Sequence, residues 1–221
     1  MNRKFHGFTF SLVLGVISFV VMPSHAQEEV ARQVGLLFAG KFEKADITSD
    51  VRGTKKTQLA AAYTWSYGVR LFTDETWKES GFAWEGFATR AAALADDLAG
   101  KIKPQYIRDS RGVIEYAIVS DESPFISSVL TSPVFLEPFA DTLGEKLNVI
   151  VVDRNVLYVF PGIGGKLADF GPALARTFQS TPMPVSLEVF EVDKSGFRVI
   201  GEIERAPRKA ELEVIKNLLP Q

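Results

Sequence analysis

Asn148-Val-Ile-Val-Val-Asp-Arg-Asn-Val-Leu-Tyr-Val-Phe160 is the most informative stretch of this chain. It contains two strongly β-prone runs, 149–152 and 156–160, on either side of Asp153-Arg154-Asn155. Asp and Asn tolerate the positive φ angles of tight turns. Two such runs about three residues apart are typical of a hairpin. The stretch therefore predicts an antiparallel β-hairpin.

Similar patterns occur on both sides of this hairpin. The turn residues Asp109-Ser110-Arg111-Gly112 and Asp193-Lys194-Ser195-Gly196 each lie between two extended runs, which predicts hairpins near 105–119 and 185–203. Apolar residues at helical spacing predict helices near 76–100, 133–146 and 167–179. Because hairpins alternate with helices, we expect an α+β fold in which an antiparallel sheet built from hairpins has helices packed against it.

The N-terminal half has a less regular pattern. Residues 28–43 carry apolar side chains at helical spacing and predict a short helix, and 59–72 alternate with a period of two and predict one strand that bends near Gly68. The row Tyr63, Trp65 and Tyr67 fits the core face of a sheet, and a sugar-stacking platform is the alternative. Residues 46–57 predict a loop whose basic run is solvated, with a contact patch as the alternative.

The first 26 residues have the order of a secretory signal. A short basic stretch precedes an apolar run at 8–22, and Ser24-His25-Ala26 supplies small residues at the cleavage positions. The run is about 15 residues long, and a spanning helix needs roughly 20. We therefore expect removal of 1–26 and an exported protein, periplasmic or extracellular, without a membrane span. The remaining chain divides into 27–112 and 113–221, which are either two regions or one continuous domain.

Composition excludes several kinds of chemistry. The chain has 25 Lys+Arg, 27 Asp+Glu, two His and no Cys, and both histidines, His6 and His25, lie in the signal. Without them, catalysis by Ser-His-Asp or Cys-His groups is excluded, as are zinc sites of imidazole and thiolate. We expect no cofactor and no metal site. The nearly balanced charge gives no reason to expect nucleic acid as a partner.

The C-terminal half, about 113–203, resembles the YtpQ-like family of uncharacterised bacterial proteins. The resemblance depends on the stretch 148–160, on the helix predicted at 167–179 and on Pro-x-Pro-Val-Ser at 182–186. Asn155 stands where the family usually has Asp, Asp153 stands where it usually has a small polar residue or Asn, and an export signal is unusual for the family. Because the family's function is unknown, the resemblance implies a fold and no activity.

Two functions are compatible with these observations. The first is a non-enzymatic exported binding or accessory domain, whose partner is an unknown protein or envelope ligand. Its candidate surface is the 153–155 turn, Asp153, Arg154 and Asn155, with the neighbouring Tyr158; ordinary hairpin chemistry is the alternative explanation of that turn. The second is a hydrolase that acts on a cell-envelope polymer with two carboxylates. Its candidate residues are Asp121, Glu122, Asp153 and Glu188.

Overall fold

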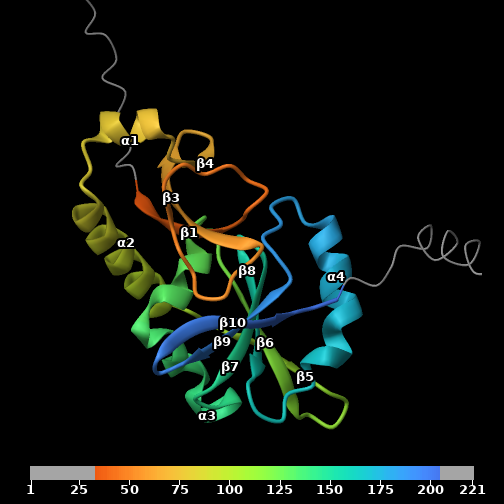
Figure 1. Ribbon diagram of the computed structural model, residues 1–221. Helices are drawn as coiled ribbons and strands as arrows, with labels where there is room; N and C mark the ends of the chain where they lie inside the picture. The colour runs from red at the N-terminus through yellow and green to blue at the C-terminus, as the bar shows by residue number, and fades with distance from the viewer. Residues whose placement is uncertain (1–32, 205–221) are drawn as a thin grey trace, which may run out of the picture. The chain divides into compact units, whose positions relative to one another are not determined.

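Two antiparallel sheets and the helices packed on them form the part of the chain that the computed structural model describes, residues 33–204 (Figure 1). The predicted signal at 1–26 lies outside the described residues. All described residues belong to one compact unit. Within them, no helix is both long enough and apolar enough to cross a bilayer.

The larger sheet has six strands in the order β10-β9-β7-β8-β6-β5, and every neighbouring pair is antiparallel. The three predicted hairpins supply all of them, and the α+β fold is confirmed. The strands are β5 (Gln105–Arg108), β6 (Ile114–Ser120), β7 (Leu147–Asp153), β8 (Val156–Pro161), β9 (Glu188–Asp193) and β10 (Gly196–Glu202).

Strand β7 lies at the centre of this sheet because it is apolar on both faces. Val149 pairs with Val159 of β8 on one side and with Phe190 of β9 on the other. On one face, Val149 belongs to the main core, and on the opposite face Ile150 packs in a second core with Leu174. A strand that is buried on both faces reads as a continuous apolar run, which is the pattern of 149–152.

The helix predicted at 28–43 is wrong for the part that the structure describes. Residues Val34–Gly40 form strand β1, which pairs antiparallel with β3 (Thr57–Trp65); β2 (Thr48–Ser49) also pairs with β3. Residues 37–40 are all buried. Burial on both faces removes the apolar–polar alternation that marks a strand, and the remaining apolar spacing resembles that of a helix.

The strand predicted over 59–72 is a hairpin. The chain reverses after Trp65 and returns as β4 (Gly68–Leu71), and Gly68 adopts a φ of 129°, which favours glycine. The aromatic row is not a continuous core face, since Tyr67 is 84% exposed. The Arg70 guanidinium lies 3.4 Å from the centre of the Trp65 ring and covers one face of it.

The helix predicted over 76–100 is two helices, α1 (Asp74–Ser80) and α2 (Trp84–Ala99). Gly81 separates them with a left-handed φ of 67°. A capping box formed by Thr73 and Thr76 begins α1. Helix α2 packs Phe87 and Ala91 against Ala61 of the small sheet.

The other two predicted helices are partly 3₁₀ in character. Pro133–Phe139 is a 3₁₀ helix that continues as α3 (Ala140–Leu143), because Pro138 has no N–H to donate within a helix. A short 3₁₀ segment (Leu167–Phe170) leads into α4 (Gly171–Ser180), and a further one spans Ile126–Thr131. Helix α4 lies beside the large sheet in Figure 1 and packs Leu174 into the second core.

Candidate functional site

The predicted turn between β7 and β8 is folded into the protein. Asp153 is buried, and its Oδ1 accepts from the backbone N–H of Asn155 at 2.8 Å. Its Oδ2 accepts from the Thr181 hydroxyl and from the Met183 backbone N–H. The Asp153 carboxylate therefore attaches the turn to the segment that precedes β9.

Arg154 in the same turn is only 9% exposed and forms an ion pair with Glu43, which follows β1. The Arg154 Nε and the Asn155 Oδ1 are buried, with no hydrogen-bond partner in the described part of the chain. Tyr158 does not extend this group, since it packs in the second core beside Ile150 and Phe160. The structure thus brings Asp153, Arg154 and Asn155 together and places Tyr158 among apolar side chains.

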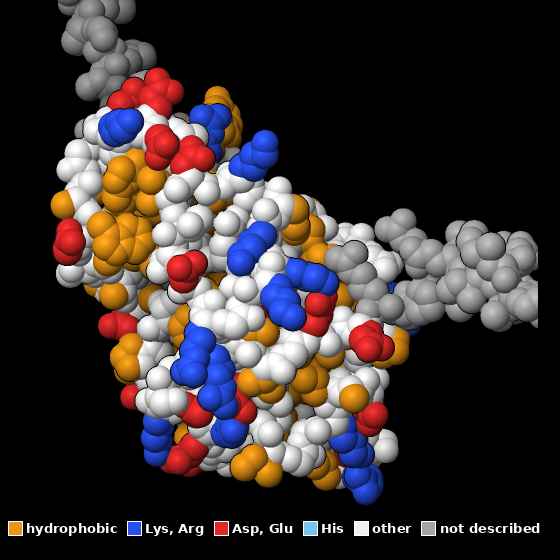
Figure 2. All heavy atoms as spheres, in the orientation of Figure 1, with side chains coloured by type: hydrophobic (Ala, Val, Ile, Leu, Met, Phe, Trp, Pro, Cys, Tyr) orange, Lys and Arg blue, Asp and Glu red, His pale blue; other side chains and the backbone are white. Residues whose placement is uncertain are grey.

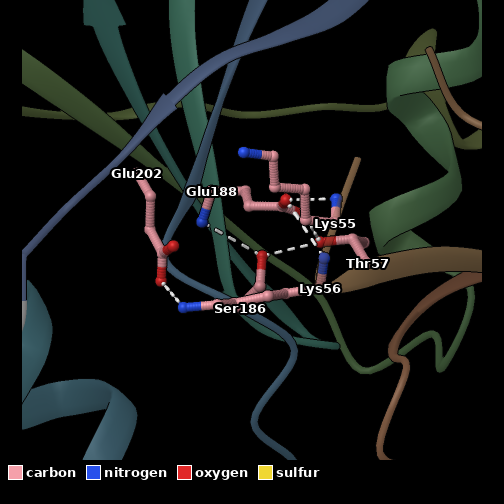
Figure 3. A network of polar contacts seen from close by, with 6 residues as sticks. All are labelled: Lys55, Lys56, Thr57, Ser186, Glu188 and Glu202. Atoms are coloured by element: carbon pink, nitrogen blue, oxygen red, sulfur yellow. Dashed lines mark hydrogen bonds and ion pairs between the residues drawn. The ribbon is translucent and has the colours of Figure 1, made fainter. Parts of the chain in front are cut away.

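A second polar cluster joins the small sheet to the start of β9 (Figure 3). Its centre is Glu188, which is only 2% exposed. Glu188 Oε1 accepts from the backbone N–H groups of Lys55 and Lys56 at 2.7 and 3.1 Å, and its Oε2 accepts from the Thr57 hydroxyl at 2.6 Å. These contacts connect residues about 130 positions apart in the sequence.

The hydroxyl groups of Thr57 and Ser186 supply enough protons for the hydrogen bonds between the side chains of this cluster. An ionised carboxylate only accepts, so Thr57 donates its single hydroxyl proton to Glu188. Ser186 lies 2.7 Å from the Thr57 oxygen and donates to it. The Ser186 oxygen in turn accepts from the Glu188 backbone N–H at 3.1 Å. Every group is therefore satisfied when Glu188 is ionised, and the buried charge has the donors that it needs.

A surface hollow of about 220 Å³ lies beside this cluster. We call it the lysine hollow, and it is lined in part by Lys41, Phe42, Lys55, Lys56, Phe178 and Glu202. Lys56 Nζ forms an ion pair with Glu202 at 2.5 Å. In Figure 3 the Lys55 side chain runs to the side of the Glu188 cluster opposite the Lys56–Glu202 pair, and within residues 33–204 its ammonium has no carboxylate partner. The residues that line the hollow therefore include three lysines and one glutamate.

The pairing of β1 with β3 forces two of these lysines together. The Lys41 backbone N–H donates to the Lys56 carbonyl at 2.7 Å, which extends the β1–β3 pairing by one residue. Like charges on directly opposed residues destabilise an antiparallel pair. The Lys41 ammonium donates a hydrogen bond to the Thr54 carbonyl at 3.4 Å.

Phe42 gives the lysine hollow an apolar wall. Its ring is 65% exposed and lies against Gly40, where an added Cβ would overlap the ring. Gly40 therefore allows the aromatic ring to fold back over the backbone. Exposed large apolar side chains beside charged ones are a feature of binding sites.

Another charged cluster is centred on Glu191 of β9, whose carboxylate pairs with two cations. Glu191 pairs with Lys146 at 2.7 Å and with Arg198 at 2.5 Å. The hydrogen bond from Lys146, followed by that from Arg198, holds the pKa of Glu191 below its ordinary value, although burial acts in the opposite direction. Lys and Arg side chains gather in the middle of the face shown in Figure 2.

The four candidate carboxylates of a hydrolase lie in two different environments. Asp121 and Glu122 are exposed, and Asp121 Oδ1 accepts from the Ser123 backbone N–H at 2.7 Å. Asp153 and Glu188 are buried, and their oxygens accept hydrogen bonds from the protein itself. Among the described residues, no three or more His, Cys, Asp or Glu side chains are close enough to hold a metal ion.

Comparisons of this chain with protein-family models, with curated proteins and with solved structures found no match. The resemblance to the YtpQ-like family therefore remains a prediction. The site must be interpreted from its own geometry.

The sequence contained one signal for the lysine hollow, the basic run at 46–57, for which a contact patch was one of two interpretations. Lys41 and Phe42 had no such signal, because only the β1–β3 pairing brings them to Lys56. Glu188 was selected only as a possible catalytic carboxylate. Its contacts show that it holds the backbone of Lys55 and Lys56.

Proposed function

We propose that this protein is an exported, non-enzymatic binding or accessory protein that binds an anionic ligand in the lysine hollow. The observation that carries the proposal is the composition of the lining, which includes three lysines, Lys41, Lys55 and Lys56, and one carboxylate residue, Glu202. Export is supported by the signal pattern of residues 1–26 alone. The YtpQ-like resemblance is compatible with this proposal and adds no activity to it.

Binding has more support than hydrolysis. A catalytic carboxylate must reach its substrate, but Glu188 and Asp153 are buried and use their oxygens inside the protein. The lysine ammonium groups are at the surface, where a ligand reaches them. Opposite charges in contact near a protein surface attract by a few kcal/mol before desolvation is subtracted, roughly 4 kcal/mol at 4 Å.

A charge-removal experiment tests the proposal. The triple variant Lys41→Gln, Lys55→Gln and Lys56→Gln is titrated with inorganic phosphate at low ionic strength, and binding is followed by NMR shifts. The matched control replaces Lys78, Lys103 and Lys166 with Gln, since these exposed lysines have no carboxylate partner within 33–204. We expect the wild type and the control to bind alike and the triple variant to lose binding. Equal binding by all three proteins, or no binding by the wild type, contradicts the proposal.

A secretion experiment tests the export component separately. The full chain is expressed in a bacterial host, and the mass of the exported protein is measured. We expect the loss of residues 1–26. A cell-associated product that retains Met1 contradicts export without bearing on the anion site.

A further inference from the structure

We propose that this protein forms a weak two-fold dimer through the end of the large sheet that carries Ile163. The surface shares no lining residue with the lysine hollow, so the inference goes beyond the proposed function and does not depend on it. Three features carry it: exposed apolar side chains on neighbouring loops, a broad hollow beside one of them, and balanced charge around both.

Four connecting segments meet at this end of the sheet. The register places the start of β7 beside the end of β8 and the end of β9, because Leu147 pairs with Pro161 and with Val192. The loop after β8 also lies beside the β5–β6 turn, since both line a small hollow of about 120 Å³. These two loops are at the bottom of the ribbon in Figure 1.

Two aliphatic side chains are exposed on these loops. Ile163 is 81% exposed and Val113, on the β5–β6 turn, is 56% exposed. The loop that carries Ile163 has a fixed shape, because the Gly162 N–H donates to the Lys146 carbonyl at 2.7 Å and an added Cβ would be too close to the same oxygen. The exposure of Ile163 therefore belongs to a defined loop, and apolar side chains held out in this way serve as anchors in protein interfaces.

A broad hollow of about 480 Å³ lies beside Ile163. Ile163 lines it together with polar residues from two other segments, Glu145, Lys146, Asp193, Lys194 and Ser195. The volume is in the range that takes a drug-sized ligand, roughly 300–1,000 Å³, so an isoleucine side chain fits. The aliphatic stems of the two lysines offer it apolar surface.

A projecting side chain next to a hollow fits a two-fold dimer. In such a dimer the same patch of each copy meets the other, so both copies supply the projection and the hollow. Ile163 of one copy enters the hollow of the second copy and contacts the partner's Ile163. One patch thus provides both halves of the interface.

The charges of this surface favour a second copy over other partners. The residues that line the two hollows include four acidic and four basic ones, namely Asp109, Glu115, Glu145 and Asp193, and Arg111, Lys146, Lys166 and Lys194. Glu191 and Arg198, which pair with each other beside Lys146, add one charge of each sign. A patch without net charge does not attract an anionic polymer or an anionic bilayer, and it does not repel its own copy. An apolar centre with a polar rim is also the usual anatomy of a protein interface.

The dimer should be weak. The exposed apolar area is small, and interfaces of small area belong to transient complexes. Lysine side chains also lose rotamer freedom when they are ordered in an interface. We expect a Kd on the order of 0.1 mM.

The test is sedimentation equilibrium from about 10 μM to about 1 mM, on protein purified after expression of the full chain. We expect the average mass to rise from that of a monomer toward that of a dimer. Ile163→Asp should raise the Kd by about tenfold or more, because it replaces an apolar contact with a carboxylate. The matched control Ile200→Asp changes a half-exposed isoleucine of β10 and should leave the Kd unchanged. Circular dichroism melting curves verify that both variants are folded.

Cross-linking gives a second measurement, because the chain has no Cys and an engineered thiol is unique. Ile163→Cys treated with oxidised glutathione should form a disulfide-linked dimer about tenfold faster than Tyr67→Cys. Tyr67 is a matched control, since it is 84% exposed and lies at the β3–β4 turn.

Three results would overturn the inference: a monomer at every concentration, the same Kd in Ile163→Asp as in the wild type, or equal cross-linking of the two cysteine variants. Binding to vesicles of phosphatidylcholine and phosphatidylglycerol that is lost in Ile163→Asp would also overturn it, because Ile163 would then contact lipid. None of these results bears on phosphate binding in the lysine hollow, so the dimer and the proposed function can fail separately.

Discussion

The 153–155 turn and the lysine hollow are both rich in charged residues, but they use their charges differently. In the turn, Asp153 accepts from three donors, and Arg154 is paired with Glu43. The hollow is lined by three lysines and one glutamate, Glu202, which pairs with Lys56, and the Lys41 backbone N–H donates to the Lys56 carbonyl. The polar groups of the turn hold segments of the fold together, and in the proposed function the lysines of the hollow bind a ligand.

The comparison shows why charged residue types alone do not identify a site. Asp153, Arg154 and Asn155 carry the more conspicuous sequence motif, yet the charged groups of Asp153 and Arg154 already have partners inside the protein. Lys41, Lys55 and Lys56 form no motif. A binding site is indicated by charge that the fold leaves unmatched, and that quantity depends on the partners of each side chain.

Removal of the buried Glu188 carboxylate should change the stability of the protein more than any other substitution in this comparison. Glu188→Ala leaves two backbone N–H groups and the Thr57 hydroxyl without their acceptor. We expect a loss of about 3 kcal/mol in the free energy of unfolding, measured by urea denaturation. The control Glu202→Ala breaks a partly exposed pair and should cost less than about 1 kcal/mol. Equal costs would show that Glu188 does not hold the hollow together.

Replacement of Asp153 should have the next largest effect and should separate stability from binding. Asp153→Ala removes the acceptor of Asn155, Thr181 and Met183, and we expect a loss of about 2 kcal/mol. The affinity of the folded variant for inorganic phosphate should not change. A weakened affinity would instead show that the 153–155 turn is part of the binding surface.

Acid should destabilise the cluster of Glu191, Lys146 and Arg198, and the loss of stability should be smaller than in the two variants above. The pKa of Glu191 is lower in the folded protein than its ordinary value of 4.5, so its contribution is present above that pH and is lost as the pH falls through the folded pKa. Glu191→Gln should therefore be less stable than the wild type at neutral pH, and the difference should shrink toward about pH 3. Urea midpoints at both pH values measure this difference, and a constant difference would show that the pairs with Lys146 and Arg198 contribute nothing.

The smallest expected change in stability is a gain. Lys41→Gln removes the repulsion between Lys41 and Lys56, and we expect a gain of a few tenths of a kcal/mol. The same variant should bind inorganic phosphate more weakly. Thermal melting and titration measure the two effects, and a loss of stability together with unchanged binding would show that Lys41 has only a structural role.

Most of the large sheet could be predicted from the sequence. Its hairpins are local, because each turn cluster, such as Asp193-Lys194-Ser195-Gly196, lies within a few residues of both strands that it joins. The small sheet could not be predicted in the same way. Strand β1 is buried on both faces and pairs with β3 more than 20 residues later, so neither alternation nor a short turn marks it.

By itself, the sequence determined the α+β class and the three hairpins, because alternation, turn residues and helical spacing are local properties of the chain. It also determined the functional groups available, with no Cys and with His only at positions 6 and 25. Only the tertiary structure decided that Glu188 is buried and accepts hydrogen bonds from Lys55, Lys56 and Thr57. It also decided that Lys41 lies opposite Lys56. The physical reason is that burial and charge pairing depend on contacts between segments far apart in the sequence.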